Sequence, residues 1–158
     1  TLTDGLKGAI PAVMLLALAY SVNALSSQRG TANYIINMTE GLLTPHLLPA
    51  IIFLVSAVMA FATGSSWGTF AICMPIALPL AFNFTGGTLT ILVIASFAAV
   101  AGGGVFGDHC SPLSDTTVLS STGAAADHID HVKTQLPYAL VCGALAMAAY
   151  LVVGFCFV

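Results

Sequence analysis

Two carboxylates stand close together in the most polar part of a very apolar chain. Asp108 and Asp115 follow the uncharged run 41–107 and lie seven residues apart, which is about two turns of a helix. Three hydroxyl side chains stand between and beside them: Ser111, Ser114 and Thr116. Hard oxygen ligands of this kind suit a hard monovalent or divalent cation. The stretch therefore predicts a cation site.

A carboxylate in so apolar a setting also suits proton chemistry. Placing an aspartate at membrane depth costs roughly 2.5–3.5 kcal/mol on insertion scales, so such a residue indicates function. A carboxyl group partly removed from water binds a proton more readily. One carboxylate can thus hold either Na⁺ or H⁺, and mutually exclusive occupancy is the simplest basis for an exchange reaction.

Structural roles for the same residues also fit the sequence. Asp108, after a glycine, is a possible helix cap at the membrane surface, and the run from Ser114 to Thr117 resembles a helix start in which Asp115 takes part. Capping and ion binding are compatible. His109 fits either a proton relay or a neutral structural histidine.

A second polar cluster, Thr63–Thr69, interrupts the uncharged run. It supplies hydroxyl groups and backbone carbonyls but no charge, and its glycines let the backbone approach an ion closely. We expect Na⁺ to be held by Asp108, Ser111 and Ser66. The full set of candidate ion- or substrate-binding residues is Asp108, Asp115, Ser65, Ser66, Thr69, Ser111, Ser114, Thr116 and His109.

The composition indicates where such a site must lie. Of 158 residues, 6% are charged and 58% are hydrophobic, and the mean hydropathy is +1.01, whereas a soluble domain carries about 25% charged residues. This excludes a cytosolic enzyme, a disordered segment and a disulfide scaffold. Three basic residues cannot form a nucleic-acid patch. The sequence predicts an all-α polytopic membrane protein.

Charges and helix breakers divide the chain into elements. Uncharged runs at 8–25 and 136–158 are each long enough to cross a bilayer as one helix. The polar segment 26–44 between them fits an amphipathic helix in the membrane interface or a water-exposed connection.

The long uncharged run predicts two interrupted elements. We expect a re-entrant helical hairpin at 47–82 with its tip at 64–68, and a crossing helix at 88–122 unwound mid-membrane near 107–114. Irregular backbone at membrane depth survives only where protein buries it or a polar cavity receives it. Two ordinary spans joined by a solvent loop remain the alternative for the hairpin.

One further polar segment, 124–134, is expected to be a cytoplasmic loop. His128 and His131 with Asp127 and Asp130 fit a metal or pH-sensing cluster, or simply a solvated loop or helix start. The Lys/Arg bias places Lys7 and this loop in the cytoplasm and makes the hairpin enter from outside.

Two motifs resemble the NhaC-type sodium/proton antiporter family. The first is the run Thr-Gly-Ser-Ser-Trp-Gly-Thr-Phe that begins at Thr63 and is followed by a proline-containing arm. The second is Gly-Gly-Gly-Val-Phe-Gly-Asp-His-Cys-Ser-Pro-Leu-Ser-Asp-Thr-Thr at 102–117. The resemblance covers about 40–158, whereas 1–39 fits by position more than by motif.

The resemblance implies half of an inverted-repeat transporter. Similar proteins of the wider ion-transporter superfamily contain two repeats, each with a re-entrant hairpin and a broken helix. The chain then corresponds to the C-terminal repeat of a longer protein, with a scaffold-like part at 1–45 and a transport part at 46–158. The ion is expected between the hairpin tip and the broken helix.

The implied function is antiport of sodium or lithium against protons. Family relatives that exchange malate for lactate or carry amino acids leave a sodium- or proton-coupled exchanger of organic acids or amino acids as the alternative. We expect a multi-pass protein of the inner or plasma membrane, without cofactors other than the transported Na⁺ and H⁺. The expected partners are the lipid bilayer and the missing N-terminal repeat or a second copy in a homodimer, and not nucleic acid.

Other functional classes fit less well. A channel needs a continuous polar path, whereas one break rich in aspartate favours an occluded site. An assembly subunit has no need of two aspartates at membrane depth. The stretch 109–115 contains His, Ser and Asp, but nothing sets a nucleophile beside a base, so we expect no enzyme.

Overall fold

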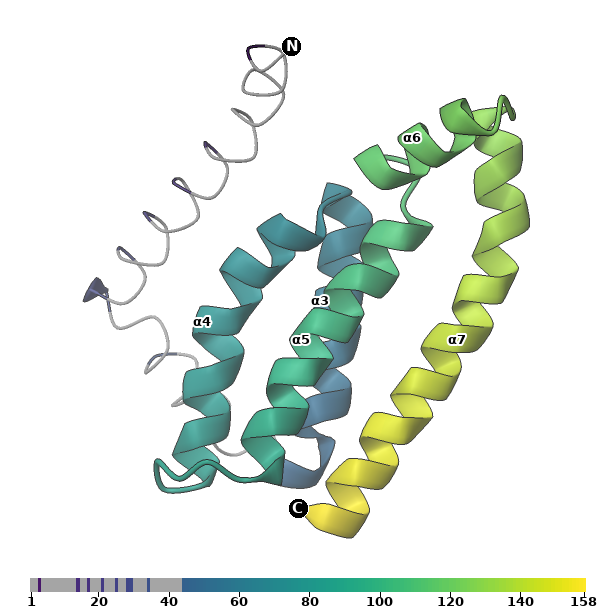
Figure 1. Ribbon diagram of the computed structural model, residues 1–158. Coiled ribbons are helices and arrows are strands. Elements are labelled where there is room, and N and C mark those ends of the chain that lie inside the picture. The colour runs from purple at the N-terminus through teal and green to yellow at the C-terminus, as the bar shows by residue number, and fades with distance from the viewer. Residues whose placement is uncertain are drawn as a thin grey trace.

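The computed structural model describes residues 44–158 continuously and eight isolated positions before them: 3, 14, 17, 21, 25, 28, 29 and 34. In the continuous part all regular structure is helical, without strands (Figure 1). Its elements are η1 Pro45–Leu47, α3 Leu48–Thr63, α4 Ser66–Phe84, α5 Ile91–Cys110, α6 Asp115–Gly123 and α7 His128–Phe157. The predictions for 8–25 and 26–43 fall outside the described residues.

The helices run up and down in one bundle. α5 packs against α3 most extensively, and also against α4 and α7. The loop between α4 and α5 lies with the C-terminus at one end, and the turn between α3 and α4 lies with α6 at the other (Figure 1). Within residues 44–158, four helical segments are long and apolar enough to cross a membrane: Pro45–Thr63, α4, α5 and α7.

The helical hairpin has its turn inside the predicted tip. α3 ends at Gly64, which takes the left-handed conformation (φ 65°) and donates its N–H to the Ala60 carbonyl at 2.8 Å. Ser65 caps α4 by accepting the Gly68 N–H at 3.2 Å. Each arm has 19 residues, enough to cross alone. The re-entrant nature of the hairpin therefore stays a prediction.

The break in the second interrupted element comes later than predicted. Residues 107–110 form the last turn of α5, and the irregular segment is 111–114. α5 has 20 residues, which is by itself long enough to cross. The break therefore follows a full-length helix and does not divide one span in the middle.

The reason lies in the glycines of α5, which serve packing and not unwinding. A Cβ built on Gly103 would collide with the Phe53 carbonyl oxygen, and one on Gly107 with the Ala57 carbonyl oxygen. Two glycines four residues apart therefore let α5 lie directly against the backbone of α3, as small residues do between membrane helices.

The last helix begins earlier than predicted. The expected loop at 124–134 is short, because Asp127 caps α7 by accepting the Ile129 and Asp130 N–H groups at 3.0 and 3.1 Å. Pro137 lies inside α7, in the third turn after its start at His128. The helix-start alternative for this segment is thus correct.

The glycine packing gives a first test. Gly107→Ala is expected to lower the free energy of unfolding by about 1–3 kcal/mol or more, because the new methyl group meets the backbone of α3. The thermal unfolding midpoint in detergent measures this. Gly123→Ala is the matched control, since no atom lies within 4 Å of its added Cβ. Equal midpoints for the two variants would contradict the packing role.

Candidate functional site

The hairpin tip and the break between α5 and α6 touch each other. A Cβ added to Gly64 would lie 2.7 Å from the Leu113 carbonyl carbon and 2.8 Å from its oxygen. Ser111 is buried and donates its hydroxyl to the Phe61 carbonyl at 2.7 Å, while it accepts the Leu113 N–H at 3.1 Å. The end of α3 is thus fixed to the irregular segment 111–114.

Asp108 joins the same two parts through its carboxylate. Ser66, in the first turn of α4, donates its hydroxyl to Asp108 Oδ2 at 3.2 Å. Ser114, in the break, donates its hydroxyl to Asp108 Oδ1 at 2.7 Å. The carboxylate is half-buried, and each of its oxygens accepts a hydroxyl from a different element.

The hydroxyl of Thr116 contacts that of Ser114. Thr116 Oγ1 lies 2.7 Å from Ser114 Oγ, and the Thr116 N–H donates to the same oxygen at 3.2 Å. Ser114 has a single hydroxyl hydrogen, which it uses in the hydrogen bond to Asp108. Thr116 is therefore the donor between the two hydroxyls. Ser114 is fully buried and also serves as the N-cap of α6.

The remaining candidates lie near the site with other contacts. Thr69 is buried and donates to the Ser65 carbonyl at 3.0 Å, so both residues bond within the start of α4. Asp115 is exposed in the first turn of α6. The exposed His109 offers its carbonyl to Gln135 Nε2 at 2.9 Å. Ion binding by these residues and by Ser111 stays a prediction.

Sequence reasoning missed the role of His128. Its Nε2 lies 2.8 Å from the Pro112 carbonyl, an acceptor, and therefore donates, while Nδ1 lies 3.1 Å from Ser121 Oγ. The ring ties α7 to the break and to α6. The sequence indicated only that His128 follows Asp127, a residue type that often caps a helix start. Among the described residues no three His, Cys, Asp or Glu side chains gather into a possible metal site.

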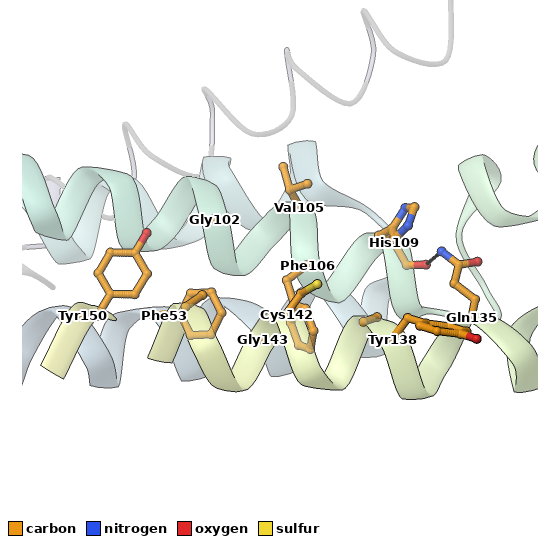
Figure 2. A pocket seen from close by; sticks show the side chains of 12 residues that line it. Phe53, Gly102, Val105, Phe106, His109, Gln135, Tyr138, Cys142, Gly143 and Tyr150 are labelled. Carbon is orange, nitrogen blue, oxygen red and sulfur yellow. Dashed lines mark hydrogen bonds between the residues drawn. The ribbon is translucent and has the colours of Figure 1, made fainter. Parts of the chain in front are cut away.

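Two cavities lie beside the site. The larger, of about 530 Å³, runs between α5 and α7, with Tyr150 toward one end and His109 and Gln135 at the other (Figure 2). The smaller, of about 230 Å³, is mostly lined by polar side chains: His109, Thr116, Thr117, Ser120, His131 and Gln135.

The long apolar helices and the polar contact between hairpin tip and helix break define a helical membrane protein. The chain belongs to the Na⁺/H⁺ antiporter family, whose model matches residues 1–155. The resemblance inferred from the two motifs is thereby confirmed at the level of the family.

Three relatives show how the chain relates to whole proteins. An uncharacterized protein of Haemophilus influenzae is 44% identical over 96% of this chain and 28% of its own length. The arginine/ornithine antiporter ArcD of Halobacterium salinarum is 33% identical over 97% and 31%. The malate-2H⁺/Na⁺-lactate antiporter of Bacillus subtilis is 27% identical over 98% and 32%. The chain spans less than a third of these relatives, and no solved structure matches it significantly.

Ser111 gives the test of how the break is held. Ser111→Ala is expected to lower the free energy of unfolding by about 1–3 kcal/mol, because the Phe61 carbonyl and the Leu113 N–H lose their partner. Thermal unfolding in detergent measures this, with the exposed Ser120→Ala as control. A stability equal to that of the control would show that Ser111 does not fasten the break.

Proposed function

We propose that this chain forms the ion-binding part of a secondary antiporter that exchanges Na⁺ or Li⁺ for H⁺, with Asp108 as the carboxylate that holds either the ion or the proton. The observation that carries this proposal is the contact of Asp108 with both Ser66 and Ser114. Asp108 is the charged group whose carboxylate joins hairpin tip and break. The family description supports the assignment of the ions.

The partial charges of the helix ends at this junction suit reversible binding of a cation. The C-terminal ends of α3 and α5 and the N-terminal ends of α4 and α6 lie at this junction. Carbonyl groups at helix C-termini carry partial negative charge and favour a cation, while N-termini stabilise the carboxylate. Secondary transporters bind their ions at meeting helix ends of this polarity, there formed by discontinuous helices.

Exchange of organic solutes is the second candidate. The relatives named for arginine and ornithine and for malate and lactate align with nearly all of this chain. The same helix N-termini that stabilise Asp108 suit the carboxylate of a small acid or amino acid. Counterflow of labelled arginine or malate in proteoliposomes would favour this candidate.

We place the protein in the inner or plasma membrane with several crossings, and the end that carries the break toward the cytoplasm. The cytoplasmic assignment follows from the Lys/Arg bias, since Lys133 lies in the first part of α7. α7 is little buried within the described residues and exposes large apolar side chains: Leu140, Val141, Leu145, Val152 and Phe155. An inverted repeat or a second copy, most simply in a symmetric homodimer, would pack against this apolar face.

Asp108→Asn tests the central assignment. In the full-length antiporter the variant is expected to fold and to lose Na⁺-driven proton flux, because the amide can neither balance a cation nor exchange a proton. A pH-sensitive dye in proteoliposomes given a sodium pulse measures the flux. Asp130→Asn, an exposed carboxylate paired with Lys133 at 3.4 Å, is the control and is expected to transport normally. Wild-type flux in the Asp108 variant would refute the proposal.

Ser66→Ala tests the contribution of the hairpin tip. Removal of the hydroxyl beside Asp108 Oδ2 is expected to raise the apparent KM for Na⁺ by roughly 10-fold, as for one hydrogen bond to a charged group. The maximal rate and the thermal midpoint are expected to change little. An unchanged KM together with a lowered midpoint would assign Ser66 to folding alone.

A further inference from the structure

The two carboxylate oxygens of Asp108 accept hydrogen bonds from different parts of the protein. Oδ2 accepts the hydroxyl of Ser66, which lies at the hairpin tip. On Oδ1 stands Ser114, with Thr116 behind it. We infer that protons reach and leave Asp108 through Ser114 and Thr116, separately from the ion. This inference rests on the proposed exchange function and specifies its proton route.

The hydrogen bonds already have the direction that proton delivery needs. Thr116 donates to Ser114, and Ser114 donates to Asp108 Oδ1, at 2.7 Å in each case. Both distances are ordinary for hydroxyl hydrogen bonds, so the three oxygens form an unbroken chain of hydrogen bonds from Thr116 to the carboxylate. Ser114 is buried, so Thr116 is the member of the chain that reaches a cavity.

The smaller cavity supplies the outer end of the route. Thr116 is exposed and lines it together with two imidazole groups, His109 from α5 and His131 from α7. The cavity holds about 230 Å³, which is room for several water molecules. It lies at the end of the bundle where α7 carries its charged residues, Asp130 and Lys133, both largely exposed. Asp115 of α6 is also exposed at this end.

The larger cavity does not offer an equivalent route. Its walls are mainly aromatic and aliphatic, as Figure 2 shows for Phe53, Phe106 and Val105. It shares only His109 and Gln135 with the smaller cavity. Water-filled connections need polar partners for each molecule, and the smaller cavity has them.

The transfer step moves one proton in total. A proton from water or imidazolium in the cavity bonds to Thr116 Oγ1, whose own hydrogen passes to Ser114 Oγ. The hydrogen of Ser114 then passes to Asp108 Oδ1. Each hydroxyl gains one O–H bond and loses one, and the carboxylate becomes a neutral carboxylic acid. The reverse sequence releases the proton.

Thr116→Val tests the route by separating two fluxes. Na⁺ uptake driven by a pH gradient requires proton transfer, whereas exchange of labelled Na⁺ for Na⁺ at uniform pH does not. The ratio of the first flux to the second is expected to fall by roughly 10-fold or more in the reconstituted protein, because the hydroxyl relay is interrupted. Thr116→Ser keeps the hydroxyl and is expected to restore the ratio.

The control is Thr122→Val, the same change at another exposed position of α6. Its flux ratio is expected to equal that of the wild type. An unchanged ratio in the Thr116→Val variant, or an equal loss of both fluxes, would overturn the proton route while leaving Asp108 as the exchange site. Failure of the wild type to couple Na⁺ to H⁺ would instead refute the proposed function.

Discussion

The close contact of α3 and α5 is the constraint on which the site depends. Gly103 and Gly107 bring α5 against the backbone of α3, so the C-terminal ends of the two helices lie together. Gly107 immediately precedes Asp108, so the packing of Gly107 against α3 also fixes the position of the Asp108 backbone. The turn at Gly64 and the break at 111–114 consequently meet, and Ser66 and Ser114 come within hydrogen-bond distance of one carboxylate.

The break is stable because its polar groups find partners within the protein. Unpaired backbone groups cost several kcal/mol each wherever neither water nor protein supplies a partner. Ser111 donates to the Phe61 carbonyl and accepts the Leu113 N–H. Ser114 accepts the Thr116 N–H, and His128 donates to the Pro112 carbonyl. One of the residues that hold the irregular backbone, Ser114, also contacts the Asp108 carboxylate.

Much of this arrangement was predictable from the sequence because polar interruptions in an apolar chain have few explanations. The residues at 64–68 and 107–114 predicted two polar interruptions, and the family resemblance implied that they lie together. The structure shows this contact, with the second interruption at 111–114. The extent of α5 was not predictable, because glycine favours both unwinding and close packing and only the position of α3 decides between them. The start of α7 was missed because Asp127 fits a loop as well as an N-cap. The partnership of His128 with Pro112 has no local signal, since the residues are 16 positions apart.

The geometry at Asp108 bears on how two cargoes would compete in the proposed exchange. An ion beside Oδ2 leaves the hydrogen bond from Ser114 to Oδ1 in place, so steric exclusion is not required for competition. Two unit charges 4 Å apart interact by about 4 kcal/mol at an effective dielectric constant of about 20. Protonation of Oδ1 removes this attraction, which corresponds to about a thousandfold loss of cation affinity. A proton that arrives on one oxygen can thus expel a cation held at the other, and the two need not share a path to do so.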